Sequence, residues 1–176
     1  MYGKIIFTIL FTVFLVATQL SFISGLPAGF SNVNLILVSL IFISVIGGSK
    51  FSVWWAIGAG LFMDILSFLS FGTYLLSLVA IALLIDFSLK KWFTNRSLYT
   101  FLALTILATV SYSILIKLSS YLMHFLSGSG FILILNEKFW TNELSQLVLN
   151  LLSVAVIFYF FNLLSIKLKP VFLIKK

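Results

Sequence analysis

Three ionisable side chains stand inside long apolar stretches of the sequence. Asp64 lies in the run GAGLFMDILSFLSFG, and Lys117 and His124 lie in the apolar run 98–126. An ionised carboxylate that faces hydrocarbon is costly, so such a residue is expected to face another helix or a partner. The sequence therefore raises three roles for Asp64, which are chemistry, transport of an ion or proton, and a contact that holds helices together.

The polar residue types argue against catalysis. Cysteine is absent, which excludes disulfides, thiolate nucleophiles and cysteine-based metal sites. His124 is the only histidine, and no second histidine or nearby acid completes a metal site with it. The sequence has no HExxH motif, phosphate loop or G-x-S-x-G-like turn, and Asp64 and Asp86 are expected at opposite membrane levels. We therefore predict a protein that is not an enzyme and uses no cofactor or metal.

The composition indicates an integral membrane protein. Of the 176 residues, 62% are hydrophobic and 9% are charged, whereas about a quarter of a soluble domain is charged. The pattern predicts an all-α fold with six transmembrane helices in a single transmembrane domain, residues 1–176. The first run is expected to be a retained span, because it is long and no small-residue cleavage site follows it. The predicted spans are 5–23, 31–46, 51–68, 74–89, 98–126 and 144–166.

The basic residues predict the orientation of these spans. Nine of them fall in connections on one side and only Lys138 falls on the other, with Lys117 inside the fifth run. This bias is typical of cytoplasmic loops, so both termini are predicted to be cytoplasmic. The net charge of +7 therefore reflects membrane orientation, and no nucleic-acid partner is expected. The nine residues are Lys4, Lys50, Lys90, Lys91, Arg96, Lys167, Lys169, Lys175 and Lys176.

Helical periodicity places Asp64 on a stripe of small residues. At about 100° per residue, Ala56, Gly60, Asp64 and Ser67 fall on one face of the third predicted helix. Small residues on such a face let a second helix approach closely. Because the helix is predicted to run outward from about residue 51, Asp64 is expected in the outer half of the membrane.

The fifth and sixth predicted helices carry polar stripes at a similar height. A shared polar centre in the outer half of the membrane would explain both, with Asp64 pairing with Lys117. Lys117 could instead extend its long stem to the outer head groups, and the sequence leaves this choice open. The stripes consist of Thr109, Ser113, Lys117, Ser120 and His124, and of Gln146, Asn150 and Ser153.

Three further acidic residues are assigned ordinary surface roles. Asp86 lies four residues before Lys90, so a local ion pair or a solvated helix end accounts for it. Glu137 and Glu143 are expected to be solvated in the outer connection. Glu143 also suits the first turn of the sixth helix, where the helix dipole favours an acid.

The stretch around Asp64 resembles the signature of a known family. It fits the pattern G-x3-D-x2-S-x4-G with Gly60, Asp64, Ser67 and Gly72, and it resembles the signature of the rod shape-determining protein MreD family. The length, the six apolar runs and the basic connection after the fourth run agree with this family. One departure is Phe68, where the family often has a small residue. The off-stripe Gly72 is interpreted as a turn into the fourth span.

The resemblance implies a non-catalytic function. MreD-like proteins lie in the bacterial inner (cytoplasmic) membrane, bind the bitopic protein MreC and work with MreB and the cell-wall synthases in cell elongation. The motif residues would then have a structural or partner-binding role, and a homodimer is left open. The family is similar in architecture to substrate-binding subunits of energy-coupling-factor transporters. Two alternatives therefore remain, a small-molecule-binding subunit of a vitamin transporter and an ion-coupled carrier that uses Asp64 and Lys117.

Overall fold

The computed structural model describes residues 2–27, 29–67, 69–93, 97–126 and 137–172. Side chains are described in the same ranges except at positions 2, 4, 5, 120, 123–126, 137–139 and 164–172. The described residues form six α-helices and no strand. The elements in order are α1 (Tyr2–Ala17), η1 (Thr18–Phe22), η2 (Ile23–Gly25), η3 (Phe30–Asn32), α2 (Leu35–Gly47), α3 (Ser49–Leu66), α4 (Thr73–Lys91), α5 (Leu98–Leu126) and α6 (Glu137–Phe172).

Five segments are long and apolar enough to cross a membrane, as in a multi-pass membrane protein. α3 is helical over 18 residues but is not among the five. Lys50, Asp64 and two tryptophans lower its mean hydropathy, so composition alone does not mark it as a span. The five segments are Ile6–Gly25, Phe30–Gly47, Thr73–Lys91, Leu98–Ser119 and Trp140–Leu163.

The helix boundaries differ from the predicted spans in informative places. α5 has the predicted bounds, whereas α6 has 36 residues and extends beyond the predicted span at both ends. The first predicted span is not one regular helix, because α1 gives way at Thr18 to a π-helical turn and then a 3₁₀ turn. α2 has only 13 residues and begins after Asn34, whose side chain accepts a hydrogen bond from the Leu37 backbone N–H.

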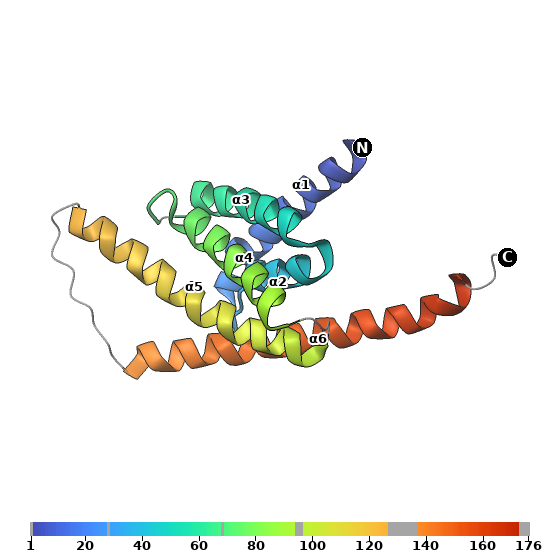
Figure 1. Cartoon of the computed structure of the whole chain (residues 1–176). Coiled ribbons are helices and arrows are strands. Elements are labelled where there is room, and N and C mark those ends of the chain that lie inside the picture. Colours follow the sequence, from blue (N-terminus) through green and yellow to red (C-terminus); the bar gives the residue numbers. More distant parts are fainter. Residues whose placement is uncertain (1, 28, 68, 94–96, 127–136, 173–176) are drawn as a thin grey trace.

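Successive helices alternate in direction along the bundle. In Figure 1, the beginning of α1, the end of α6 and the connection from α2 to α3 lie towards the right. The connection from α3 to α4, the end of α5 and the beginning of α6 lie towards the left. We call the first end the basic end, because Lys50, Lys90 and Lys91 belong to it, and the other end the Asp64 end.

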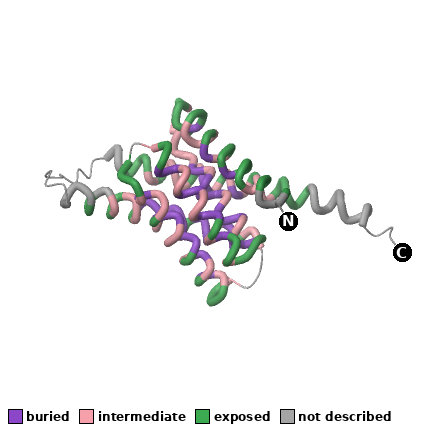
Figure 2. The backbone as a smooth tube through the Cα atoms, turned by 90° about the horizontal axis from the view of Figure 1, so that it is seen from above, coloured by how far each residue is buried: buried purple, intermediate pink, exposed green. Residues whose placement is uncertain are grey.

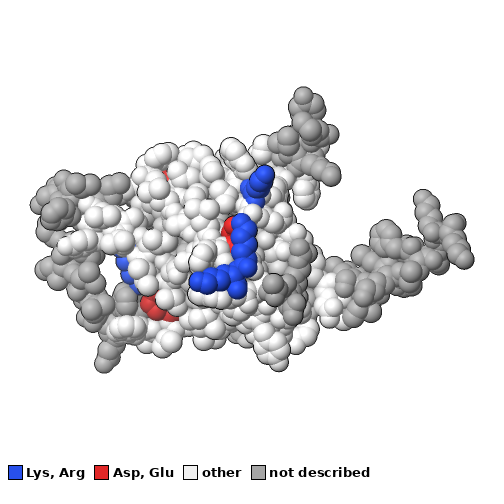
Figure 3. Space-filling view, in the orientation of Figure 1, with Lys and Arg blue, Asp and Glu red and all other residues white. Residues whose placement is uncertain are grey.

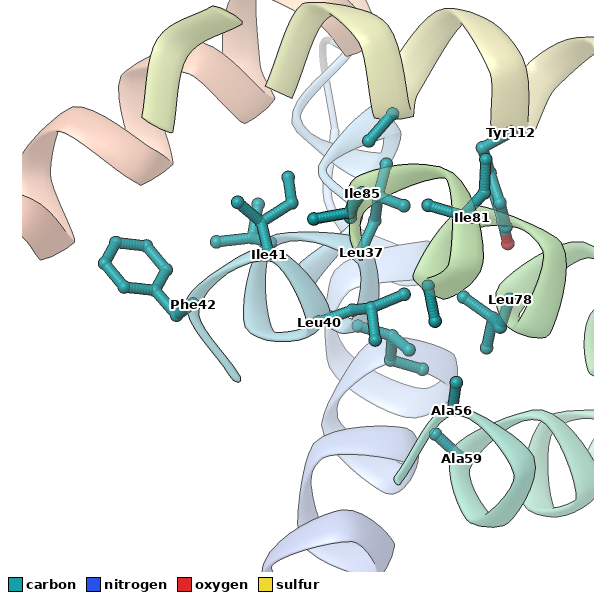
Figure 4. Close-up of a cluster of buried hydrophobic side chains, with 14 of the residues drawn as sticks. Leu37, Leu40, Ile41, Phe42, Ala56, Ala59, Leu78, Ile81, Ile85 and Tyr112 are labelled. Atoms are coloured by element: carbon teal, nitrogen blue, oxygen red, sulfur yellow. The ribbon is translucent and has the colours of Figure 1, made fainter. Parts of the chain in front are cut away.

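The core is centred on α2, and the other helices surround it. Leu37, Leu40 and Ile41 of α2 are fully buried against side chains from α3, α4 and α5 (Figure 4). Buried positions lie in the middle of the molecule and exposed ones along the outer helix faces (Figure 2). Those outer faces are apolar, with exposed residues such as Phe14 and Phe160, which fits contact with lipid.

Candidate functional site

Asp64 lies at the end of α3 and binds the beginning of α4. Its Oδ1 accepts a hydrogen bond from the Tyr74 backbone N–H at 2.9 Å, and its Oδ2 accepts one from the Leu75 N–H at 3.1 Å. The side chain is buried, with Asp64 4% exposed. The first N–H groups of a helix have no partner within it, and the positive end of the helix dipole favours a carboxylate. Asp64 therefore caps α4 from a neighbouring helix.

Gly72 explains why the side chain that caps α4 comes from α3. It is the N-cap residue of α4, and its carbonyl accepts the first helical hydrogen bond, from Leu76. Its φ of +94° lies in the left-handed region, which glycine enters without steric cost. Glycine has no side chain that could bind the N–H groups of Tyr74 and Leu75, so Asp64 supplies the acceptors. The prediction of a turn at Gly72 is confirmed.

Gly60 allows α3 and α4 to approach closely. A Cβ atom built on Gly60 would lie 2.6 Å from the Leu75 Cα and 3.1 Å from the Leu75 nitrogen. These are backbone atoms, so no rotation of a side chain could relieve the overlap. Ala56, one turn earlier, is fully buried. Three members of the predicted stripe, Ala56, Gly60 and Asp64, thus lie on the buried face of α3.

Ser67 does not belong to the helical stripe, which corrects the prediction. α3 ends at Leu66, and Ser67 follows in an extended conformation with a ψ of 163°. Its N–H still bonds the Met63 carbonyl. Its Oγ is buried and has no hydrogen-bond partner in the part of the chain that the structure describes. The chain turns away here because the connection must return to α4 within a few residues.

A second buried polar contact joins α2, α5 and α6. Asn150 of α6 is 0% exposed, and its Oδ1 accepts a hydrogen bond from the Asn34 backbone N–H at 2.9 Å. Its Nδ2 donates to the Thr109 Oγ1 at 3.3 Å. Asn34 in turn caps α2. One amide side chain therefore connects three helices at the Asp64 end of the bundle.

Lys117 pairs with Glu143 and not with Asp64. The Lys117 Nζ donates to the Glu143 Oε1 between α5 and α6. The pairing of Asp64 with Lys117, which the sequence left open, is not formed: the two Asp64 oxygens bind the backbone of α4 and Lys117 binds Glu143. Glu143 is partly exposed in this pair, and it lies within α6 and not in the connection where it was expected.

The remaining residues of the predicted polar cluster are only partly described. Gln146 accepts a hydrogen bond from the Ser113 hydroxyl at 3.3 Å, which joins α5 to α6. The His124 and Ser120 side chains lie outside the described residues. Within the described part of the chain, no three histidine, cysteine, aspartate or glutamate side chains gather as ligands for a metal ion.

The polar side chains surround a cavity of about 340 Å³ at the Asp64 end, which we call the polar cavity. A volume of this size is within the range of small-molecule sites. The cavity lies beside the Asp64 cap, because Met63 and Tyr74 contribute to its wall. Its lining residues are Gln19, Leu20, Ser24, Ser31, Asn32, Val33, Asn34, Met63, Tyr74, Tyr112, Ser113, Ile116, Lys117, Glu143 and Gln146.

Sequence reasoning missed several polar residues of this cavity, among them Gln19, Asn34, Tyr74 and Tyr112. Gln19 bonds the backbone on both sides of Asn34, donating to the Val33 carbonyl and accepting from the Leu35 N–H. An asparagine directly before an apolar run is a recognisable helix N-cap, so Asn34 carried a usable signal. Gln19, Tyr74 and Tyr112 carried none, because no motif or periodic pattern singles them out among the scattered polar residues of the apolar runs.

The basic end carries its own ion pair. Lys90 donates to Asp86 at 2.6 Å, four residues earlier in α4, which confirms the predicted local pair. Lys91 lies over the rings of Phe87 and Trp92. Figure 3 shows this basic group apart from the smaller blue and red group at the left of the molecule.

Comparison with protein-family models, with curated proteins and with solved structures finds no match to this chain.

Proposed function

We propose that the chain is a non-catalytic membrane scaffold of the MreD type. In this function it lies in the bacterial inner membrane, binds an MreC-like bitopic protein, and acts through MreB and the cell-wall synthases on cell shape and lateral peptidoglycan synthesis. The proposal rests on the resemblance of the motif Gly60, Asp64, Ser67 and Gly72 and on what the motif does in the structure.

One observation carries the proposal. Three of the four motif residues act on the same junction between α3 and α4: Gly60 admits the α4 backbone, Asp64 caps α4 and Gly72 begins it. An aspartate whose two oxygens bind backbone N–H groups is poorly placed to exchange a proton with a substrate or ion. Such a motif fits a protein that works through its shape and its partners.

The proposal includes six membrane crossings with both termini in the cytoplasm. The alternation of helix directions in Figure 1 supports it, because α3 runs between the same two ends as its neighbours. The α3–α4 pair, residues 49–91, would then form a transmembrane hairpin with its connection outside. A general likeness to substrate-binding subunits of energy-coupling-factor transporters remains part of the proposal.

Depletion in the native cell tests this function. If the chain guides elongation, rod-shaped cells should become round as it is depleted, and re-expression of the wild-type chain should restore rods. Cells that keep their rod shape after depletion would contradict the proposal.

The polar cavity favours a second candidate, a small-molecule-binding subunit such as that of a vitamin transporter. The cavity has the size of a ligand site and contains hydrogen-bonding side chains from α5 and α6. A panel of vitamins should then include one that raises the melting temperature of the purified protein. A flat response across the panel would remove this candidate.

A further inference from the structure

An apolar groove between α5 and α6 lies against the polar cavity. The groove has a volume of about 370 Å³, and its wall includes Val110, Ile114, Trp140, Leu144 and Leu147. Several of these side chains are exposed on the outer face of the molecule, with Ile114 59% exposed and Leu144 62% exposed. In a membrane this face meets lipid, so the groove opens towards acyl chains. We call it the α5–α6 groove.

Three side chains line both the polar cavity and the α5–α6 groove. Ser113, Lys117 and Glu143 line the polar cavity and also the α5–α6 groove. A polar space and an apolar space therefore meet at one ion pair. An occupant of both would need a polar group at one end and a hydrocarbon chain at the other, which is the chemistry of a membrane lipid.

We propose that this junction binds a phosphatidylethanolamine molecule, with its head group at Lys117 and Glu143 and one acyl chain in the α5–α6 groove. The inference is independent of the scaffold function, since it rests on the two hollows and the ion pair between them.

The charges at the junction favour a zwitterionic head group. Lys117 and Glu143 carry opposite charges and already pair with each other. In a head group with a phosphate and an ammonium, the phosphate can pair with Lys117 and the ammonium with Glu143. No charge is then left unpaired. A purely anionic head group would bring its phosphate close to the Glu143 carboxylate, where like charges repel.

Hydrogen bonding favours ethanolamine over choline. A primary ammonium has three N–H donors, as lysine does, and the Glu143 carboxylate is an acceptor. The quaternary ammonium of phosphatidylcholine has the same charge and no N–H donor. Gln146 lies beside the pair and accepts from Ser113, and the structure records no acceptor for its amide nitrogen among the described residues. That nitrogen is a second donor for the phosphate.

Trp140 in the groove wall provides the test. The full chain is reconstituted in phosphatidylcholine vesicles that contain a small, fixed fraction of a lipid with brominated acyl chains, which quench tryptophan fluorescence on contact. The brominated lipid carries an ethanolamine, choline or glycerol head group. The signal of Trp140 is obtained by subtracting the same measurement on Trp140→Phe, which keeps the other three tryptophans.

We expect the ethanolamine lipid to quench Trp140 roughly threefold more than either of the other lipids, a preference typical of one exposed ion pair. The variant Lys117→Gln/Glu143→Gln should lose this excess. The exchanged pair Lys117→Glu/Glu143→Lys keeps an ion pair if the first variant does not fold, and it should also lower the excess, because it puts like charges next to the phosphate and the ammonium of the bound head group. The matched variant Asp86→Asn/Lys90→Gln removes the ion pair at the basic end and should keep the full excess.

Three results would overturn the proposal. Equal quenching by the three lipids would show that the groove meets bulk lipid without selection. An excess that survives both changes at positions 117 and 143 would show that this ion pair does not select the lipid. Stronger quenching by the glycerol lipid would show recognition of an anionic head group.

Discussion

The buried carboxylate of Asp64 is stabilised by backbone and not by a cation. Two N–H groups at the start of a helix donate hydrogen bonds to the carboxylate and lie at the positive end of the helix dipole. The cost of burying the charge is thus offset within residues 64–75. A membrane protein gains in particular from such a cap, because no water in the hydrocarbon region would satisfy these N–H groups.

Replacing Asp64 should destabilise the protein in proportion to the acceptors that are lost. Asp64→Ala leaves the partly buried N–H groups of Tyr74 and Leu75 without their acceptors, and we expect a loss of about 2 to 4 kcal/mol in the free energy of unfolding. Asp64→Asn keeps one acceptor oxygen and should lose about half as much. Unfolding of the purified protein in mixed micelles, followed by circular dichroism, measures both.

Asp86→Asn is the control for removing an acidic residue. It breaks a pair in which Lys90 is largely exposed, so it should change the stability by less than about 1 kcal/mol. An Asp64→Ala protein as stable as the wild type would show that the contact with α4 contributes nothing to folding.

The hairpin of α3 and α4 depends on a close approach of two backbones. Gly60 lies directly against Leu75, and the Asp64 cap lies one turn further along α3. Close packing and the cap therefore reinforce one another, because the carboxylate reaches the start of α4 only while the helices remain in contact. Small residues at helix interfaces are a general means of association in membranes.

Gly60→Ala should separate the two helices. The added Cβ would overlap backbone atoms of Leu75, so we expect a loss of about 1 to 3 kcal/mol, which the same unfolding measurement detects. Gly58→Ala is a matched control in the same helix, since a Cβ there meets nothing within 4 Å. It should be neutral or stabilising by up to about 1 kcal/mol, because alanine favours the helix. Equal effects of the two changes would contradict the close approach at Gly60.

The stability of variants at Gly72 should depend on how well each residue tolerates a left-handed backbone conformation. With φ at +94°, Gly72→Ala is expected to cost about 1 to 2 kcal/mol in the free energy of unfolding. Gly72→Asn should cost less, because asparagine tolerates the left-handed region better than alanine does. Melting temperatures measured in the same detergent rank the two variants, and the opposite order would argue against the left-handed turn.

The whole molecule is a bundle around α2 whose helices alternate in direction (Figure 1). Hydropathy marks five of these helices as spans and leaves α3 undecided. If α3 crosses the membrane, its polar content is accommodated by packing against α4 and not by exposure to water. The predicted six crossings differ from the five apolar candidate spans only in α3.

Single cysteines can count the crossings, because the chain has none of its own. With six spans, Ser70→Cys after α3 should react with a membrane-impermeant maleimide in intact spheroplasts. Ser49→Cys at the start of α3 and Trp92→Cys after α4 should react only after lysis. Labelling of Ser49→Cys and Ser70→Cys from the same side would show that α3 does not cross.

The sequence predicted the helices and one face of α3, and it could not predict the partner of Asp64. Helical periodicity showed that Asp64 faces a neighbour and that Gly72 turns the chain. The partners of the Asp64 carboxylate are backbone N–H groups. Nearly every residue has such a group, so no residue type in the sequence marks these partners. The bond between Asn150 and Asn34 joins positions 116 apart, and only the packing of α2 against α6 brings them together. The long α6 was missed because a helix can continue beyond its apolar part.

The scaffold function is tested most directly by capturing its partner. The tagged chain is solubilised from native membranes under mild conditions, and the proteins bound per folded molecule are measured for the wild type, Asp64→Ala and Asp86→Asn. We expect the wild type and Asp86→Asn to retain an MreC-like protein with a single membrane span. We expect Asp64→Ala to yield less folded protein or less of that partner. Full recovery of folded wild-type chain with no such partner, or an intact complex in normal amounts with Asp64→Ala, would contradict the scaffold function.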